Sequence, residues 1–421
     1  MTGASNGLAT SSLPASRPGA GDAQGKKRAR IWWFVHQWVG LKLSVLLSFI
    51  LLTGTLAIFS NEIDWMINAD MRVDPRTVDG EVAWSRVAEN AAAALPGGEI
   101  FTVHAPIDRG FAAAAMGRTA DGDIKWVYAH PTTGAVQGVG GFFTVQRVLR
   151  YLHRHLMLPN KIGVPIVSAT SILLFISLAT SFVVYKKWWR GFFKPVRLRD
   201  ARTATGDFHR LAGVWSLWFV ALMAATGFWY LVESLGGRAP NVPRPDVAAV
   251  DGDAADFAAG VSAAIGAARG AYPDLRIRSV SLPDRRFGAY WISGQDDAIL
   301  VRSRANGVYV AAATGRAALS YDAHALSVHQ RIAEMADPLH FGTFGGVWTK
   351  LIWFVFGAVL TGLSISGAAI YSLRLAKQAR QSPRWRRGAG DLWRGMGVWK
   401  WPSSALVFAG LVLVVLAIGR A

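Results

Sequence analysis

The stretch "FHRLAGVWSLWFVALMAATGFWYLV" (residues 208–232) is apolar and long enough to cross a bilayer, and a histidine stands near its start. A second stretch, "VHQWVGLKLSVLLSFILLTGTLAIF" (residues 35–59), follows the same pattern. In each, the histidine is followed by a glycine at +4 and by Thr-Gly at +17 and +18. The matched residues are His36, Gly40, Thr53 and Gly54 in the first copy, and His209, Gly213, Thr226 and Gly227 in the second. The shared spacing indicates a duplicated membrane segment.

Hydropathy predicts five membrane spans. The chain has 421 residues, of which 52% are hydrophobic, and its mean hydropathy is positive. A spanning helix needs about 20 mostly apolar residues. Five stretches meet this requirement, at residues 31–59, 162–185, 208–232, 347–371 and 401–419. The first stretch is too long for a secretory signal peptide and is followed by a poor cleavage site, so we expect it to remain as a helix.

The distribution of Lys and Arg predicts the orientation. Basic residues collect in the N-terminal tail and in residues 186–202 and 374–400, whereas residues 60–125 hold more acids than bases. Because positive loops stay on the cytoplasmic side, we expect a bacterial inner-membrane protein with a cytoplasmic N-terminus, two long periplasmic loops and a periplasmic C-terminus. The net charge of +18 then reflects this topology, and no motif indicates binding to nucleic acid.

Two absences in the sequence restrict the chemistry. The chain has no cysteine, which excludes disulfides, iron–sulfur clusters and covalently attached c-type haem. No G-x-G-x-x-G motif follows a predicted strand and opens a helix, which argues against a nicotinamide or flavin domain. If the protein carries electrons, they must come from a separate donor such as quinol or a reductase.

We predict a mainly α membrane protein with a four-helix transmembrane core from a tandem duplication, a fifth C-terminal span and two small α+β outer domains. Its first half comprises a disordered cytoplasmic tail (1–30), span 1 (31–59), outer domain 1 (60–146), and an outer histidine segment with span 2 (147–185). A basic cytoplasmic loop (186–207) leads to span 3 (208–232), outer domain 2 (233–338), and a second histidine segment with span 4 (339–373). Another basic loop (374–400) precedes span 5 (401–419).

An outer-side histidine precedes each of spans 2 and 4. The segments are "YLHRHLMLPNKIG" and "PLHFGTFGGVW", and matching their Leu-His pairs aligns His153 with His340. The distance to the next matched tyrosine then differs by one residue, and aligning His155 instead gives the opposite mismatch. We take His153 from its Leu-His context, while His155 remains an alternative to it. His324 and His329 remain alternatives to His340.

The four histidines suggest two haem sites. A bundle with pseudo-two-fold symmetry would place His36 opposite His209 and His153 opposite His340, and imidazole is a common axial ligand of haem iron. The alternative is that these side chains merely sit among lipid headgroups. A zinc or iron transport site would instead want carboxylates within the spans, where the sequence has almost none.

The matched glycines are compatible with flat cofactors. Eighteen residues make five helical turns, so Gly54 would lie on the face of His36, about 27 Å along a straight helix. Gly40 and Gly213 would then flank one macrocycle, and Gly54 and Gly227 a second. The alternative is ordinary small-residue packing between membrane helices.

Three arginines form a basic face beside His153. Arg147, Arg150 and Arg154 follow helical spacing on the outer side, where positive charge is normally sparse. They could pair with haem propionates or with an anionic substrate, and the alternative is a solvated face paired with nearby acids. We assign no catalytic side chain.

The chain resembles the PepSY-associated transmembrane family, often called iron-regulated membrane proteins. The resemblance rests on "HQWVGL…TG", "LHRHL", "FHRLAG…TG", "LHFGTFGG", "VYAHPTTGAV" and "VYVAAATGRA", which together cover about residues 31–373. It implies two periplasmic PepSY domains and, as in some members, two haem b groups that reduce ferric siderophores. The ligands would be His36, His209, His153 and His340. The rival interpretation is a non-catalytic membrane protein whose PepSY domains bind a peptide or a partner, without a redox role.

Overall fold

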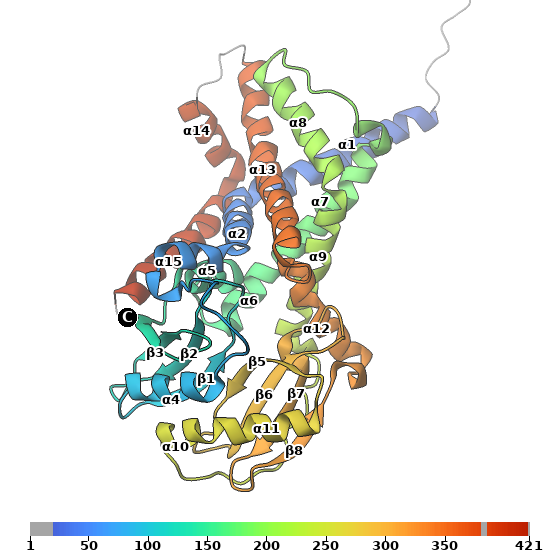
Figure 1. Cartoon of the computed structure of the whole chain (residues 1–421). Coiled ribbons are helices and arrows are strands. Elements are labelled where there is room, and N and C mark those ends of the chain that lie inside the picture. Colours follow the sequence, from blue (N-terminus) through green and yellow to red (C-terminus); the bar gives the residue numbers. More distant parts are fainter. Residues whose placement is uncertain (1–19, 380–384, 420–421) are drawn as a thin grey trace, which may run out of the picture.

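The computed structural model describes residues 20–379 and 385–419. The chain is mainly helical, and one antiparallel sheet lies at one end of a group of long helices (Figure 1). Within the described residues, four helices are long and apolar enough to cross a membrane, and a fifth span results if the bent pair α1–α2 is counted as one. The chain is therefore a membrane protein with an extramembrane sheet.

Two sets of helices make up the region beside the sheet. The membrane region contains α1 (Ala20–Lys42), α2 (Ser44–Ala57), α6 (Asn160–Ser168), α7 (Thr170–Val184), α8 (Ala201–Trp215), α9 (Leu217–Val232), α13 (Gly346–Gln378), α14 (Trp385–Met396) and α15 (Lys400–Ile418). Shorter helices connect it with the sheet: α3 (Ser60–Ile67), α5 (Val145–His155) and α12 (Val328–Phe341). We call the end of the membrane region near the sheet the sheet side. The opposite end, where residues 185–200 join α7 to α8, is the loop side.

The first membrane helix of each half is broken at the same position, seven residues after its histidine. Leu43 separates α1 from α2, which are bent by 68°, and Ser216 separates α8 from α9. The Ser216 hydroxyl donates to the Ala212 carbonyl at 2.8 Å, and bonding of this kind bends helices. The straight helix that the spacing of about 27 Å in span 1 assumes is therefore wrong, because α1 and α2 meet at 68°. Because of the 68° bend, the straight-line distance from His36 to Gly54 is about 23 Å, instead of about 27 Å along a straight helix.

The predicted loop-side segments contain more helix than expected. Residues 1–19 of the predicted disordered tail lie outside the described residues, but Ala20–Arg30 already belongs to α1. Helix α8 begins at Ala201, inside the predicted loop 186–207, because the Asp200 carboxylate accepts from the Thr203 amide at 3.0 Å and caps it. The predicted loop 374–400 contains the end of α13 and all of α14. The Lys42 ammonium donates to the Gly395 carbonyl at 2.7 Å and ties α14 to α1.

The two predicted outer domains share a single eight-stranded antiparallel sheet. Its order is β4-β3-β2-β1-β5-β6-β7-β8. The first half supplies β1 (Glu99–His104), β2 (Ala113–Arg118), β3 (Ile124–Ala129) and β4 (Val136–Gly141). The second supplies β5 (Arg276–Ser281), β6 (Ala289–Gln295), β7 (Asn306–Ala311) and β8 (Arg316–Tyr321). Each half has the predicted helix and strands, but strand pairing between β1 and β5 joins the halves.

The junction of the two half-sheets is short and is covered by one core. Thr102, Val103 and His104 of β1 face Ser281, Val280 and Ser279 of β5. Helices α4 (Trp84–Ala94), α10 (Ala254–Ala259) and α11 (Val261–Ala271) pack on one face, in a single hydrophobic cluster that includes Val103 and Val280. Without this pairing, β1 and β5 would each expose an unpaired edge, which explains why two separate domains are not observed.

The predicted Thr-Gly turns are present in both halves. Gly134, after β3, and Gly315, after β7, both have positive φ, at 73° and 64°. Only glycine adopts such angles without strain, so the turns recur at matched places. The duplication is thus visible in the sheet as well as in the membrane helices.

Candidate functional site

One pair of histidines lies toward the loop side. His36 of α1 faces His209 of α8, with ring centroids 6.4 Å apart and planes at 81°. The His36 Nδ1 is 2.9 Å from the Thr180 hydroxyl, and the His209 Nδ1 is 2.9 Å from the Ser366 hydroxyl. We call His36 and His209 the loop-side pair. Its two rings are held by hydroxyls of the second and fourth spans.

A second pair lies at the sheet side. His153 of α5 faces His340 of α12, with ring centroids 6.0 Å apart and planes at 35°. The His153 Nδ1 is 2.8 Å from the Ile50 carbonyl, and the His340 Nδ1 is 2.8 Å from the Thr226 hydroxyl. We call His153 and His340 the sheet-side pair. The structure thus brings together all four sequence-predicted histidines, two by two.

The hydrogen bonds of all four rings are compatible with a proton on Nδ1. The Ile50 carbonyl only accepts, so the His153 Nδ1 carries the proton. The hydroxyls of Thr180 and Thr226 already donate to carbonyls of their own helices, at 2.7 and 2.8 Å, so each accepts from a histidine. Ser366 does the same through a 3.3 Å bond to the Leu363 carbonyl. With the proton on Nδ1, the Nε2 of each ring has a free lone pair.

The separation of the rings suits one metal ion between two imidazoles. Two metal–nitrogen bonds of about 2 Å, plus about 1.2 Å from each nitrogen to its ring centre, give roughly 6.4 Å. Two ligands are too few for a structural zinc site, and no group of three His, Cys, Asp or Glu within the described residues could hold a bare metal ion. The pairs fit an ion that brings its own equatorial ligands, as in haem.

The four matched glycines differ in what surrounds them. A methyl group on Gly54 would lie 2.5 Å from the His153 Cε1, so this glycine makes room for the imidazole itself. A methyl group on Gly227 would lie 3.0 Å from the Ser171 Cβ. Beside the loop-side pair, a methyl group on Gly40 would have no neighbour within 4 Å, and one on Gly213 would meet only Leu363, at 3.8 Å. Open space therefore borders Gly40, whereas Gly213 is in ordinary van der Waals distance of Leu363.

A cavity of about 520 Å³ opens at the sheet-side pair. Its lining includes His153 and His340, and both Gly54 and Gly227 border it. Leu47, Ile50, Phe219, Trp353 and Leu360 are among its apolar lining residues. The volume lies within the usual range for cofactor sites, which are mostly apolar with a few polar groups. We call this space the sheet-side cavity.

Basic side chains line one part of the sheet-side cavity. Arg150 and Arg154, which the sequence singled out, are joined there by Lys161 and Arg238. Arg147 does not line it, because its guanidinium stacks 3.8 Å over the Phe142 ring. Burial lowers the pKa of the Arg150 guanidinium, although its side chain remains accessible through the cavity. Arg150 and Arg154 therefore could contact an anion in the cavity, and Arg147 could not.

A charged cluster that the sequence did not reveal ties the sheet to the helix of His340. Arg302 donates to Glu334 at 2.8 and 2.9 Å and to Asp337 at 2.8 Å. The Tyr230 hydroxyl donates to Asp337 at 2.7 Å. Burial raises the pKa of Asp337, but Arg302 and Tyr230 more than offset this effect, and the pKa lies below its usual value. One signal was present: Asp337 is three residues before His340, on the same face of one helix.

The alternative ligands point elsewhere. His155 is buried and packs on the Tyr151 ring, with centroids 4.7 Å apart, rather than on another histidine. His324 is bonded to Asp297 at 2.7 Å, and the His329 Nε2 lies 3.1 Å from the Gly237 carbonyl. Neither faces His153. The structure therefore pairs His153, not His155, with His340.

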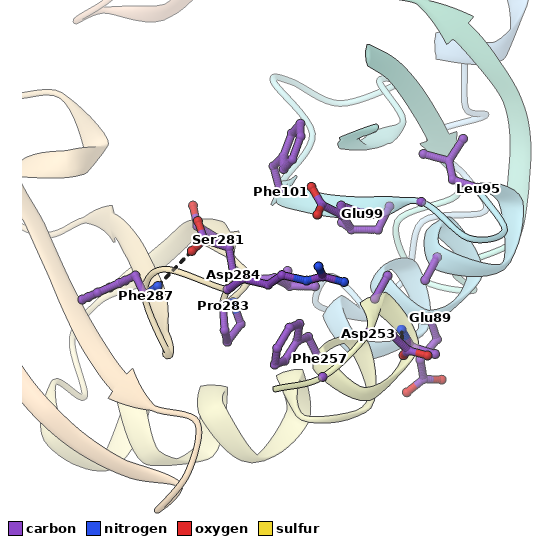
Figure 2. Close-up of a pocket in the computed structure, with 18 of the residues that line it drawn as sticks. Glu89, Leu95, Glu99, Phe101, Asp253, Phe257, Ser281, Pro283, Asp284 and Phe287 are labelled. Carbon is purple, nitrogen blue, oxygen red and sulfur yellow. Dashed lines mark hydrogen bonds between the residues drawn. The ribbon is translucent and has the colours of Figure 1, made fainter. Parts of the chain in front are cut away.

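A separate groove of about 660 Å³ lies between the two half-sheets (Figure 2). It is lined by the end of α4, the start of α10 and the loop after β5, and it shares no lining residue with the sheet-side cavity. Three of its acidic groups have partners: Asp253 caps α10, Asp284 accepts from the amide of Phe287, and Glu99 pairs with Arg118 at 3.6 Å. The fourth, Glu89, is exposed. No histidine is among the residues that line this groove.

Comparison with known proteins gives the family. No curated protein matches the chain. The family model of the PepSY-associated TM region matches residues 33–374, a stretch that includes all four paired histidines and the eight-stranded sheet. The chain therefore belongs to the PepSY-associated transmembrane family.

Proposed function

We propose that this protein binds two haem b groups and carries electrons across the bacterial inner membrane to a ferric complex, such as a ferric siderophore, in the periplasm. The observation that carries the proposal is the state of the four histidines. Each has its Nδ1 bonded to a protein oxygen and its Nε2 free, and the rings face each other at 6.4 and 6.0 Å. Outer-shell bonds of this kind orient metal-bound histidines.

The surroundings of both pairs support haem. At the loop side, the open space beside Gly40 would leave room for the edge of a flat group, and the only atom near a methyl group on Gly213 would belong to the flexible Leu363 side chain. At the sheet side, the cavity of about 520 Å³ does so, and Arg150 and Arg154 would hold the propionates. Haem supplies a redox-active iron, and this chain supplies the ligands and the apolar surroundings that set its potential.

The position of the two pairs supports electron transfer from one face of the membrane to the other. One pair lies toward the loop side and the other at the sheet side of the membrane region. With the basic loops in the cytoplasm, the sheet-side pair would face the periplasm. Reduction would favour iron release, because hard oxygen donors hold Fe²⁺ less tightly than Fe³⁺. Quinol or a reductase would be the electron donor.

The optical spectrum of the purified protein tests this function. We expect about two haems per chain and a Soret band that shifts on reduction with dithionite. A membrane-inserted, folded chain that is colourless after expression with ample haem would contradict the proposal. It would favour the rival function, a PepSY membrane protein that binds a peptide or a partner.

A further inference from the structure

Four basic side chains line the sheet-side cavity without a carboxylate at ion-pair distance among the described residues. Arg150 and Arg154 come from α5, Lys161 from α6, and Arg238 follows the turn 233–237. Within the described residues, none of the four forms an ion pair. The other two bases that line the cavity are satisfied: Arg302 and Arg304 bind Glu334 at 2.8 and 3.0 Å. The positive charge that no carboxylate pairs with thus lies on these four side chains.

The excess of positive charge is larger than a cofactor would neutralise. Six basic and two acidic side chains line the cavity, and even when Glu334 is added the bases exceed the acids by three. The two propionates of one haem would leave this mouth positive. Placing a cation in low-dielectric surroundings costs free energy unless an anion lies close to it. The pKa of Arg150 is lowered by burial, which shows that this side chain lies in such surroundings.

The four bases divide by position. Arg150 and Arg154 flank His153 on α5, three residues before it and one after it, and are therefore the pair closest to the ligand. Lys161 stands at the start of α6, and Arg238 stands just beyond the turn 233–237, which packs against α6. Lys161 and Arg238 therefore form a second basic pair on the cavity wall, contributed by other elements than α5.

We propose that Lys161 and Arg238 form a docking site for an anionic metal chelate of the carboxylate or catecholate class, at the mouth of the sheet-side cavity. This inference rests on the proposed function, since it names the charge class of the ferric complex and the place where it binds. The bound chelate would lie beside the sheet-side pair and outside the groove between the half-sheets. Charged oxygen donors would recognise the ammonium and the guanidinium directly.

Binding of a redox-inert probe tests the site apart from reduction. The haem-loaded full chain is placed in nanodiscs of phosphatidylcholine, and binding of gallium citrate is measured at low and at physiological salt. A neutral gallium trishydroxamate is the comparison ligand. We expect gallium citrate to bind more tightly, to weaken with salt, and to weaken about tenfold in the variant Lys161→Gln/Arg238→Gln. The control is Arg316→Gln, which removes an exposed base from the edge strand β8 and should change nothing.

Three results would overturn the docking site. These are equal binding of both chelates, unchanged binding in the double variant, and binding of phosphatidylglycerol but not of gallium citrate through the same two side chains. The last result would identify a lipid headgroup as the anion. Haem content is measured in every preparation, so that the two proposals fail separately. A haem-free chain contradicts the proposed function, whereas a haem-loaded chain without a preference for the anionic chelate contradicts only the docking site.

Discussion

At the loop side, His36 and His209 are carried by membrane helices and are held by hydroxyls of neighbouring spans. At the sheet side, His153 and His340 are carried by the short helices α5 and α12, which lie between the spans and the sheet. The ligand geometry is nearly the same in both pairs, but the supports differ. The sheet-side pair therefore depends on the extramembrane part of the chain, and the loop-side pair does not.

Within the sheet-side pair the two supporting helices also differ. Arg302, between β6 and β7 of the second half-sheet, holds α12 through ion pairs with Glu334 and Asp337. Helix α5 has a different anchor, because the Asp64 carboxylate of α3 accepts from the amides of Val145 and Gln146 at 2.7 and 2.9 Å. The duplication has thus kept the ligands and changed what positions them, as expected if only ligand geometry is strictly constrained.

Removing one ligand should have the largest effect and should be confined to one side. We expect His209→Ala to abolish haem binding at the loop-side pair and to leave about half of the haem, since the two sites are separate. The double variant His36→Ala/His209→Ala should lose no more haem than the single one. Transmembrane electron transfer should stop in both. The measurement is haem per chain by the pyridine haemochrome assay, together with reduction of a periplasmic-side acceptor in vesicles.

A matched control keeps this prediction specific. His324 is exposed and bonded to Asp297, so His324→Ala should keep both haems. Full haem content in His209→Ala would show that His209 is not a haem ligand and that its side chain merely lies among lipid headgroups. Loss of all haem in a folded variant would show that the two sites are not independent.

Breaking the Arg302 cluster should disturb only the sheet-side pair. Arg302→Met leaves Glu334 and Asp337 without their shared cation, and breaking such a pair costs about 3 kcal/mol. We expect an altered spectrum and a shifted midpoint potential for the sheet-side haem, faster hydrogen exchange in α12, and an unchanged loop-side haem. Arg304→Gln is the control, because its side chain is 55% exposed and bonds only Glu334. Equal changes at both haems would show that the two pairs do not have separate supports.

Substitution of Gly54 and of Gly40 should show which glycine makes space for a histidine ring and which makes space for a cofactor. Gly54→Ala would place a methyl group 2.5 Å from the His153 Cε1, and overpacking of this kind costs about 1–3 kcal/mol even without haem. Gly40→Ala meets no atom within 4 Å, so in the haem-free protein it should be neutral or should stabilise α1 by up to about 1 kcal/mol. With haem bound, it should weaken the loop-side site. The measurements are thermal unfolding of both forms and haem affinity. Unchanged haem affinity in Gly40→Ala would show that the haem ring does not occupy the space beside Gly40.

The sequence predicted what depends on repetition and missed what depends on bending and on tertiary contact. His36 and His209 were found because a fixed spacing occurs twice, and His153 and His340 because a Leu-His pair occurs before spans 2 and 4. The break at Leu43 was not found, because this apolar residue carries no local signal for a bend. Its equivalent Ser216 could have suggested a bend through its hydroxyl. The pairing of β1 with β5 and the ion pair of Arg302 with Asp337 join residues that are far apart in the chain. The spacing of residues along the sequence does not reveal such contacts.

The smallest expected effect concerns the caps of α5 and α12. Helix α12 has a local capping box, in which the Ser327 hydroxyl and the Gln330 side chain bond each other's backbone amides, at 3.3 and 3.0 Å. Helix α5 has only a long local cap, the Thr144 hydroxyl that accepts from the Arg147 amide at 3.4 Å, and its other cap is the distant Asp64, which accepts from two amides. Each substitution, Ser327→Ala or Asp64→Ala, should cost about 1 kcal/mol from the lost cap. Ser327→Ala should only fray the first turn of α12, since Arg302 still holds the turns before His340. Asp64→Ala should release α5 from α3, so that hydrogen exchange increases up to His153 and the sheet-side haem spectrum broadens. If both variants fray only a first turn, Asp64 is no more than a cap, and the two helices do not differ in the way their histidines are positioned.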